Sequence, residues 1–188
     1  MNRITPGKIL SAAVVLALLA GIGIIGNRLF TEEKRGPAGT EVTGDEPLGI
    51  ELRTVTLYFG APDSISLTPE RRDVPARSDM AGNLTGALED LAAGPLGPLV
   101  PTLPQGTRVM HVFLDGEGTA YVDFSPDFLV GMDGSLSREV MAIRSIARTL
   151  AANFTGLTRL QILVEGRIVP TLGGQLDLTR PLELSEWN

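Results

Sequence analysis

The chain has 188 residues, no cysteine, one histidine and a formal net charge of −6. Without cysteine it can form no disulfide, thiol-based active site or cysteine-ligated metal centre, and a single histidine leaves a histidine-based metal site without a second nitrogen ligand. The negative charge lies beyond residue 35, where 20 acidic residues face 11 basic ones, so we expect no nucleic acid among the partners.

The first element along the chain is an apolar run. Ile9–Ile25 comprises 17 uncharged residues, with Ser11 as the one polar side chain. As a helix the run is about 26 Å long, close to the thickness of a bilayer core. Because the preceding tail is short and no second apolar run follows, we predict a single-pass transmembrane signal-anchor with a cytoplasmic N-terminus and an exported body. Two alternatives stay open: a signal peptide cleaved near Gly21 and a buried core helix.

Composition divides the chain into three parts. Residues 1–30 form the cytoplasmic tail and the signal-anchor, with the span at about residues 9–25. Residues 31–52 are rich in glycine, proline and polar residues, which predicts a flexible linker. Residues 53–188 are long enough for one domain with a hydrophobic core.

Two extended segments are predicted at the start of the domain. Thr54–Phe59 is β-branched and aromatic, as is typical of a strand. Ile65–Val74 is a weaker extended segment and contains Pro69. A proline within a strand places that strand at the edge of a sheet.

The next predicted element is an amphipathic helix at Ser78–Ala93. Its apolar residues recur at spacings of three and four. Either Ser78 or Asp79 can serve as the N-cap, and Gly94-Pro95 ends the helix.

A β-hairpin is then predicted at Thr107–Leu114 and Thr119–Phe124, joined by the turn Asp115-Gly116-Glu117-Gly118. From residue 109 the first strand reads Val-Met-His-Val-Phe-Leu. Both its odd-numbered and its even-numbered faces are mostly apolar. The pattern therefore predicts a central strand that is covered on both sides.

After a predicted loop at Ser125–Gly134, the strongest helical pattern runs from Leu136 to Phe154, with Ser135 or Ser137 as its cap. A strand at Leu160–Val164 ends at Glu165-Gly166, and Ile168–Asn188 is a tail of short extended pieces. This order of elements predicts an α+β domain, with two helices on one face of a small, largely antiparallel sheet, preceded by the transmembrane helix.

Few polar residues are candidates for chemistry. A Ser-His-Asp triad would have to use His111, which lies within a strand among apolar neighbours. Asp123, Asp127 and Asp133 lack the alternate spacing of an EF-hand Ca²⁺ loop and are better explained as caps and turn residues. We expect Asp123 in particular to end its strand and to begin the turn that follows.

The remaining candidates have similar explanations. Asp115 and Glu117 lie at a solvated hairpin tip, whereas a glycosidase needs two separated carboxyls in a cleft. Gly173-Gly174 has neither the lysine nor the following helix of a phosphate-binding loop. Trp187 can anchor against the domain or a partner, and both interpretations stay open. We therefore predict no catalytic, cofactor-binding or metal-binding residue.

Four sets of segments carry a family resemblance through their order and spacing. They are Val55-Thr56-Leu57-Tyr58-Phe59; Leu88-Glu89-Asp90-Leu91 with Gly94-Pro95; Pro104-Gln105-Gly106-Thr107 with Ala120-Tyr121-Val122-Asp123-Phe124-Ser125; and Arg144–Leu150 with Leu160–Val164, Glu165-Gly166 and Gly173-Gly174. Through these segments, residues 53–182 resemble the GerMN domain, the repeat unit of a sporulation and germination protein. The chain has one such copy instead of two, and a predicted anchor instead of a lipobox.

The resemblance implies a non-enzymatic, extracytoplasmic domain, similar in fold to the ring-building motifs of secretion and sporulation assemblies. We therefore predict a binding or scaffolding module, anchored in the bacterial cell membrane, with a sheet edge as its contact surface. Its expected partners are envelope proteins or peptidoglycan. More specifically, the similarity to ring-building motifs suggests that the domain forms homo-oligomers. The alternatives are an envelope polysaccharide-acting hydrolase and a small-ligand sensor domain.

Overall fold

The computed structural model describes residues 50–63, 65–132 and 134–187, all within the unit Pro47–Asn188. The predicted membrane span at Ile9–Ile25 and most of the predicted linker lie outside the described residues, so both stay predictions. Within the described ranges, none of the helices combines the length and the apolar character needed to cross a bilayer.

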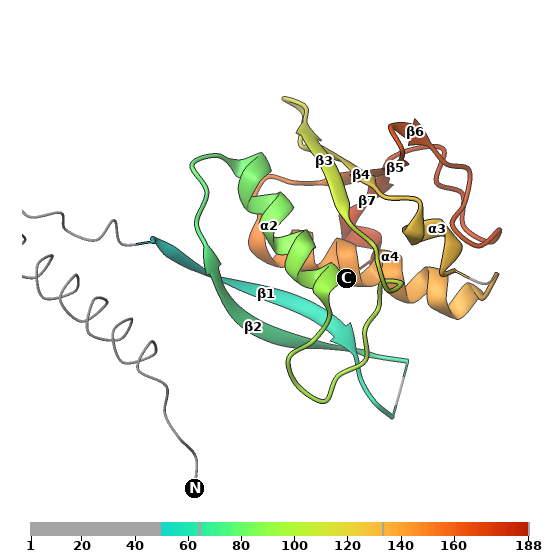
Figure 1. Cartoon of the computed structure of the whole chain (residues 1–188). Coiled ribbons are helices and arrows are strands. Elements are labelled where there is room, and N and C mark those ends of the chain that lie inside the picture. Colours follow the sequence, from blue (N-terminus) through green and yellow to red (C-terminus); the bar gives the residue numbers. More distant parts are fainter. Residues whose placement is uncertain (1–49, 64, 133, 188) are drawn as a thin grey trace, which may run out of the picture. The chain divides into compact units, whose positions relative to one another are not determined.

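The described elements follow one another as strands and helices of an α+β domain (Figure 1). In chain order they are β1 (Leu52–Gly60), β2 (Leu67–Pro75), α2 (Met80–Ala93), β3 (Val109–Leu114), β4 (Thr119–Phe124), α3 (Asp127–Val130), α4 (Leu136–Asn153), β5 (Arg159–Val164), β6 (Arg167–Ile168), β7 (Leu182–Glu183) and the 3₁₀ helix η1 (Leu184–Trp187). The predicted α+β class is confirmed.

The described strands form two sheets instead of the single sheet predicted. β1 and β2 pair as an antiparallel hairpin, from Leu52 opposite Pro75 to Gly60 opposite Leu67. The other five strands form a second sheet in the order β3-β4-β5-β6, with β7 also paired to β5. The hairpin remains separate because the second edge of β1 meets side chains of α4.

β4 and β5 run parallel, the one exception among the named strand pairs of the described residues to the predicted, largely antiparallel pairing. The connection between them holds α3 and the 18-residue α4, and a crossover of this length lets the chain return in the same direction. α3 lies in the segment Ser125–Gly134, which was predicted to be a loop. The pairs β3–β4, β5–β6 and β5–β7 are antiparallel.

The two long helices share one hydrophobic core with both sheets. α2 begins after Asp79, whose carboxylate accepts the Gly82 N–H at 2.7 Å, and it ends at Gly94, as predicted. The largest fully buried side chains come from both helices, both sheets, α3 and the segment after α3: Leu57, Phe59, Leu84, Leu88, Leu91, Phe124, Phe128, Met132, Ile143, Ile146, Leu150 and Leu160.

Strand β3 contradicts its prediction, because it is an edge strand and not a covered central one. The register to β4 shifts at Met110 through a β-bulge. This extra residue interrupts the alternation of side chains. As a result Val112 and Leu114 pack against the core, whereas His111 and Phe113 are exposed.

Candidate functional site

The five-stranded sheet has a buried face and an open one. The strand register places Gln161 on the side away from the core, where the C-terminal segment covers it. It also places there a group of six side chains: His111, Phe113, Tyr121, Asp123, Leu163 and Ile168. We call this group the outer face. On it the rings of His111 and Phe113 stack at 6.2 Å, and Phe113 and Ile168 are 63% and 53% exposed. Exposed apolar groups gathered in this way mark interaction surfaces.

The edge of β3 that faces away from β4 is unpaired within the described part of the chain. The Asp115 N–H donates to the Thr119 carbonyl at 3.1 Å at the end of the hairpin. Because bonded and non-bonded pairs alternate in an antiparallel ladder, Val112 and Leu114 direct their backbone groups outward. β3 contains neither proline nor a Lys, Arg, Asp or Glu side chain. Such an edge can accept a strand from a partner.

The free edge of β2 is protected instead. The backbone N–H and C=O of Tyr58 bond to α4, so the β2 residues opposite Tyr58 and its alternate neighbours face away from β1. Pro69 and Pro75 are two of these outward positions, and proline has no N–H to offer. The edge position predicted for Pro69 is therefore confirmed, and strand addition at β2 is interrupted twice.

The remaining edge of β1 is covered by a polar stripe on α4. The stripe consists of Ser145, Thr149 and Asn153, which are four residues apart and share one face of the helix. The Ser145 hydroxyl donates to the Tyr58 carbonyl at 2.6 Å, and the Thr149 hydroxyl accepts the Tyr58 N–H at 3.2 Å. The Asn153 amide accepts the Thr56 N–H at 2.8 Å and donates to the Thr56 carbonyl at 2.7 Å. Side chains thus occupy the place of a neighbouring strand. Sequence reasoning missed this stripe, although its spacing of four beside the apolar stripe was a signal.

His111 and Asp123 come together across β3 and β4, with His111 Nδ1 3.4 Å from Asp123 Oδ2. Ser125 lines the same depression but is fully buried, and its hydroxyl donates to Asp127 at 3.1 Å. A catalytic triad requires the serine to bond to the histidine. The three residues therefore do not form one.

Asp123 stabilises a turn. Its Oδ1 accepts the Gly166 N–H at 2.9 Å, within the two-residue connection between β5 and β6. Both residues of this connection, Glu165 and Gly166, have positive φ angles of 52° and 72°, as type I′ hairpin turns require. Asp123 thus has a role in a turn, but not the predicted one. It lies within β4 and stabilises the turn of another hairpin, instead of ending its own strand and beginning the next turn. Glu165 lines the same depression as Asp123, but both Asp123 oxygens already have partners.

The other acidic candidates do not assemble into a metal site. Asp127 lies in the first turn of α3 and 3.7 Å from Arg108, and Asp133 lies outside the described residues. Within residues 50–63, 65–132 and 134–187, no group of three or more metal-ligating side chains gathers at a metal-binding position.

Asp115 organises the tip of the β3–β4 hairpin. Its Oδ1 accepts the N–H groups of Thr119 at 2.8 Å and Glu117 at 2.9 Å. These bonds, chiefly that from Thr119, hold the pKa of Asp115 below its usual range. Glu117 is directed to solvent and lies 3.3 Å from Arg159. Of these two carboxyls, Asp115 therefore has a role in the turn, and Glu117 lies at the surface.

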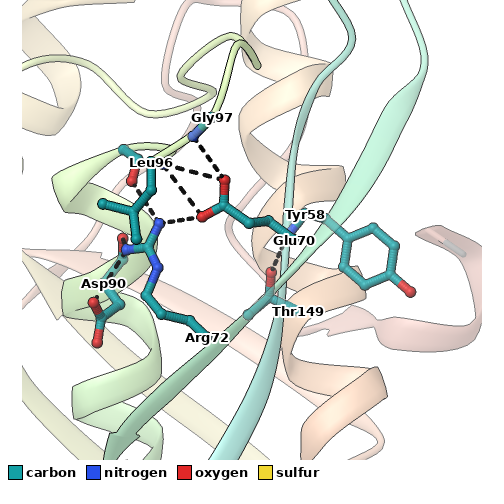
Figure 2. A network of polar contacts seen from close by, with 8 residues as sticks. Tyr58, Glu70, Arg72, Asp90, Leu96, Gly97 and Thr149 are labelled. Atoms are coloured by element: carbon teal, nitrogen blue, oxygen red, sulfur yellow. Dashed lines mark hydrogen bonds and ion pairs between the residues drawn. The ribbon is translucent and has the colours of Figure 1, made fainter.

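A second polar network fastens the β1–β2 hairpin to the end of α2 (Figure 2). The Arg72 guanidinium donates to the Asp90 carboxylate at 3.1 Å, to the Gly94 carbonyl at 3.0 Å and to Glu70. The side chains of Arg72 and Glu70 are only 11% and 16% exposed. A cation at a helix C-terminus also interacts favourably with the helix dipole. This network has a structural role.

Glu70 completes the network by accepting the backbone N–H groups of Leu96 and Gly97, each at 3.2 Å. Burial raises the pKa of Glu70, but the hydrogen bonds from Arg72, Leu96 and Gly97 outweigh burial and leave the pKa below its usual value of 4.5. The carboxylate is therefore stabilised in its charged form.

Glu139 of α4 is fully buried and holds the loop before the C-terminal strand. Its carboxylate accepts the backbone N–H groups of Leu172 at 3.0 Å, Gln175 at 3.1 Å and Leu176 at 3.3 Å. The loop that contains Gly173-Gly174 surrounds an acidic side chain, which would repel a phosphate group. Sequence reasoning missed Glu139, although its position four residues before Ile143 continues the apolar stripe.

Trp187 packs against the hydrophobic core from the 3₁₀ helix η1. The structure therefore favours the first of its two predicted roles, anchoring against the domain. The C-terminal segment also covers part of the sheet, because the buried Gln161 amide donates to the Leu178 carbonyl at 2.9 Å.

Besides the depression at Asp123, the described part of the chain has a pocket and a groove. A pocket of about 340 Å³ is lined by the end of the β1–β2 hairpin, by the segment 100–104 and by Ser137, Arg138 and Met141 of α4. A groove runs between the end of α2 and the start of β3, with Ala93 and Met110 in its walls.

The architecture is that of a small α+β domain with an open sheet face. Residues 56–169 match the family model Germane, described as sporulation and spore germination. Because the match covers more than half of the chain, the protein belongs to the Germane family. The predicted GerMN resemblance is thereby confirmed.

Solved structures share this fold. A lipoprotein from Clostridium perfringens is similar, with 22% identity and a TM-score of 0.52, over 80% of this chain and 95% of that chain. The tandem GerMN domains of the sporulation protein GerM from Bacillus subtilis are similar, with 20% identity and a TM-score of 0.56, over 72% of this chain and 48% of that one. At these identities the likeness concerns the fold alone. None of the curated proteins matches the chain.

Proposed function

We propose that this protein is a non-catalytic binding or scaffolding module of the bacterial cell envelope, tethered to the membrane by its N-terminal apolar run. The observation that carries the proposal is the open edge of β3 beside the outer face. A complete core lies under the other face of the sheet, so the exposed rings of His111 and Phe113 are not needed to fill it. Partner proteins would bind by adding a strand at β3 and covering these rings.

The absence of catalysis is inferred from the roles of the candidate groups. Among the described residues no serine bonds to His111, Asp123 holds the turn at Gly166, and Asp115 holds its own hairpin tip. A polysaccharide hydrolase needs two converging carboxyls that are free to act as acid and base or nucleophile. Since Asp123 is nearly buried with both oxygens bonded, this alternative is disfavoured.

The extracytoplasmic location rests on the 17 uncharged residues of Ile9–Ile25 and on family membership. The similar chain from Clostridium perfringens is described as a lipoprotein, which supports an association with the envelope. The Germane family description also supports a role in sporulation or germination as one setting for the module.

The location can be tested by labelling single cysteines, because the natural chain has none. In intact cells, a membrane-impermeant maleimide should label full-length Thr179→Cys, whose side chain is exposed. The Asn2→Cys variant should react only after the cells are permeabilised. Labelling of Asn2→Cys but not of Thr179→Cys in intact cells would overturn the proposed orientation.

The binding role can be tested with a photo-crosslinking amino acid placed at Phe113 in the full-length protein in its own membranes. We expect crosslinked protein adducts from this position. A matched probe at Arg71, an exposed outward position on the proline-interrupted edge of β2, should give far fewer. Equal adduct yields at the two positions would contradict binding through β3, and sedimentation only with purified peptidoglycan would redirect the proposal to the polymer.

A small-ligand sensor is the second candidate, and the pocket of about 340 Å³ favours it, because this volume lies at the lower end of known ligand sites. Ligand binding to the native state raises the melting temperature. A ligand that raises it in the natural protein, but not in a Met141→Trp variant with a filled pocket, would support this candidate.

A further inference from the structure

We propose that the strand added at β3 is β3 of a second copy of this chain, paired antiparallel with Val112 opposite Val112 of the other copy. This inference rests on the proposed function, because it names the partner of the same edge. The outward N–H and C=O groups of Val112 would bond to their symmetry equivalents. The contact would be isologous and closed, since each copy contributes the same edge.

The side chains of β3 complement themselves in this register. His111 comes opposite Phe113 of the second copy on the outer face, and Val112 comes opposite Val112. Aromatic and apolar pairs directly across an antiparallel ladder stabilise strand pairing. His111 and Phe113 are already exposed and stacked within one chain, so pairing would assemble four rings on a continuous outer face.

The charges at the two ends of β3 are also complementary. Arg108 precedes the strand and is exposed, with 70% of its side-chain surface open to solvent. Asp115 and Glu117 follow the strand, and Glu117 is 82% exposed. Antiparallel pairing brings the Arg108 end of one strand towards the end that carries these two carboxylates in the second copy. A parallel pairing would instead align like charges. Between the two ends, Val109–Leu114 carries no Asp, Glu, Lys or Arg. No two like charges of these residue types therefore face each other at the two-fold axis.

The contrast between β3 and β2 supports the choice of edge. Exposed edges commonly carry prolines or charges that prevent association. On β2 the outward positions include Pro69 and Pro75 together with Arg71 and Asp73. The edge of β3 has none of these features.

The register can be tested by disulfide crosslinking of full-length protein in membranes. His111 and Phe113 of the two copies would form a non-hydrogen-bonded pair, whose Cα atoms are about 4.5 Å apart, within the range that a disulfide spans. Differently tagged His111→Cys and Phe113→Cys chains should therefore crosslink to each other on mild oxidation several-fold more than either chain with itself. Arg71→Cys mixed with Asp73→Cys provides an equally exposed control on β2 and should not crosslink.

Charge reversal provides an independent measurement that leaves the strand intact. Arg108→Glu should lower the yield of the mixed disulfide several-fold, and Glu117→Arg introduced together with it should restore the yield. Equal self-crosslinking and mixed crosslinking, or an unchanged yield in the Arg108→Glu chains, would overturn the proposed register. Adducts of Phe113 with other proteins, and none with a second copy, would refute self-pairing while leaving the proposed function standing. No adduct at all would refute both.

Discussion

The Thr149 hydroxyl of α4 accepts the backbone N–H of Tyr58 in β1 at 3.2 Å (Figure 2). This bond belongs to the polar stripe that replaces a strand along β1. An unpaired edge within a domain would leave buried backbone groups without partners, which costs free energy. Ser145, Thr149 and Asn153 satisfy these groups, so β1 ends one sheet without offering an edge for association.

Asn153 is the side chain of this stripe whose loss we expect to be most costly. Asn153→Ala removes both bonds to Thr56 and leaves two partly buried backbone groups unsatisfied, so we expect a loss of about 2 kcal/mol in the free energy of unfolding. Urea unfolding can be followed by the fluorescence of Trp187, the single tryptophan. The control Ser137→Ala, on an exposed position of the same helix, should change stability by less than about 0.5 kcal/mol. Equal effects of the two substitutions would contradict the strand-replacing role.

The Glu70 network makes stability depend on pH. A carboxyl whose pKa is lowered in the folded state contributes stability that is fully present above its unfolded pKa and is lost as the pH falls through its folded pKa. The usual pKa of 4.5 for this carboxyl places the onset near that pH. Glu70→Gln should therefore weaken the protein most at neutral pH, and the difference from the natural protein should shrink on acidification from about pH 5 to about pH 3.

Urea midpoints at a series of pH values provide this measurement. Asp115 and Asp177 also have lowered pKa values, owing chiefly to hydrogen bonds from Thr119 and Thr179, so part of the acid sensitivity should remain in Glu70→Gln. A constant difference between the two proteins across the series would rule out the linkage to Glu70.

Glu139 should hold the loop at 172–176 in place. Glu139→Ala removes the acceptor of three backbone N–H groups, and we expect a loss of about 3 kcal/mol. Hydrogen exchange should accelerate selectively at Leu172, Gln175 and Leu176. Glu183→Gln, at an exposed acidic position, is the control and should leave these amides protected. Uniform acceleration throughout the domain would instead indicate a general loss of stability.

The local elements of this domain could be predicted from sequence because they depend on short-range patterns. Asp79 and Gly94 mark the ends of α2 through capping chemistry, and the apolar stripe defines α4 within one residue of its C-terminus.

The arrangement of strands could not be predicted in this way. The bulge at Met110 adds one residue to β3 and reverses which side chains face the core. The alternation of apolar and polar residues in the sequence does not reveal this bulge. The parallel pairing of β4 with β5 depends on the path of the connection, and the separation of β1 from the larger sheet depends on three side chains of α4. These are long-range relationships. The outer face was therefore missed, although His111 and Phe113 were correctly placed on the same side of their strand.

The hairpin tip offers a matched pair of glycines. Gly118 has a φ of +88°, and a Cβ at this position would lie 2.6 Å from the Gly156 carbonyl oxygen, whereas a Cβ at Gly116 would meet nothing within 4 Å. Gly118→Ala should therefore cost about 2 kcal/mol or more through strain and collision, and Gly116→Ala should be close to neutral. Thermal unfolding of the two variants distinguishes them, and equal melting temperatures would contradict the turn geometry.

His111 and Asp123 should differ sharply in their effect on stability although they are in contact. His111 is exposed and lies at 3.4 Å from Asp123, so His111→Ala should change the free energy of unfolding by less than about 0.5 kcal/mol. Asp123→Ala should cost about 2 kcal/mol, because it leaves the Gly166 N–H without its acceptor in a turn with two positive φ angles. If the pair acted as a catalytic unit, both substitutions would abolish the same activity while His111→Ala left the fold intact. On the proposed function, His111→Ala instead weakens partner crosslinking at Phe113, and Asp123→Ala acts first on the β5–β6 turn, which hydrogen exchange at Gly166 would report.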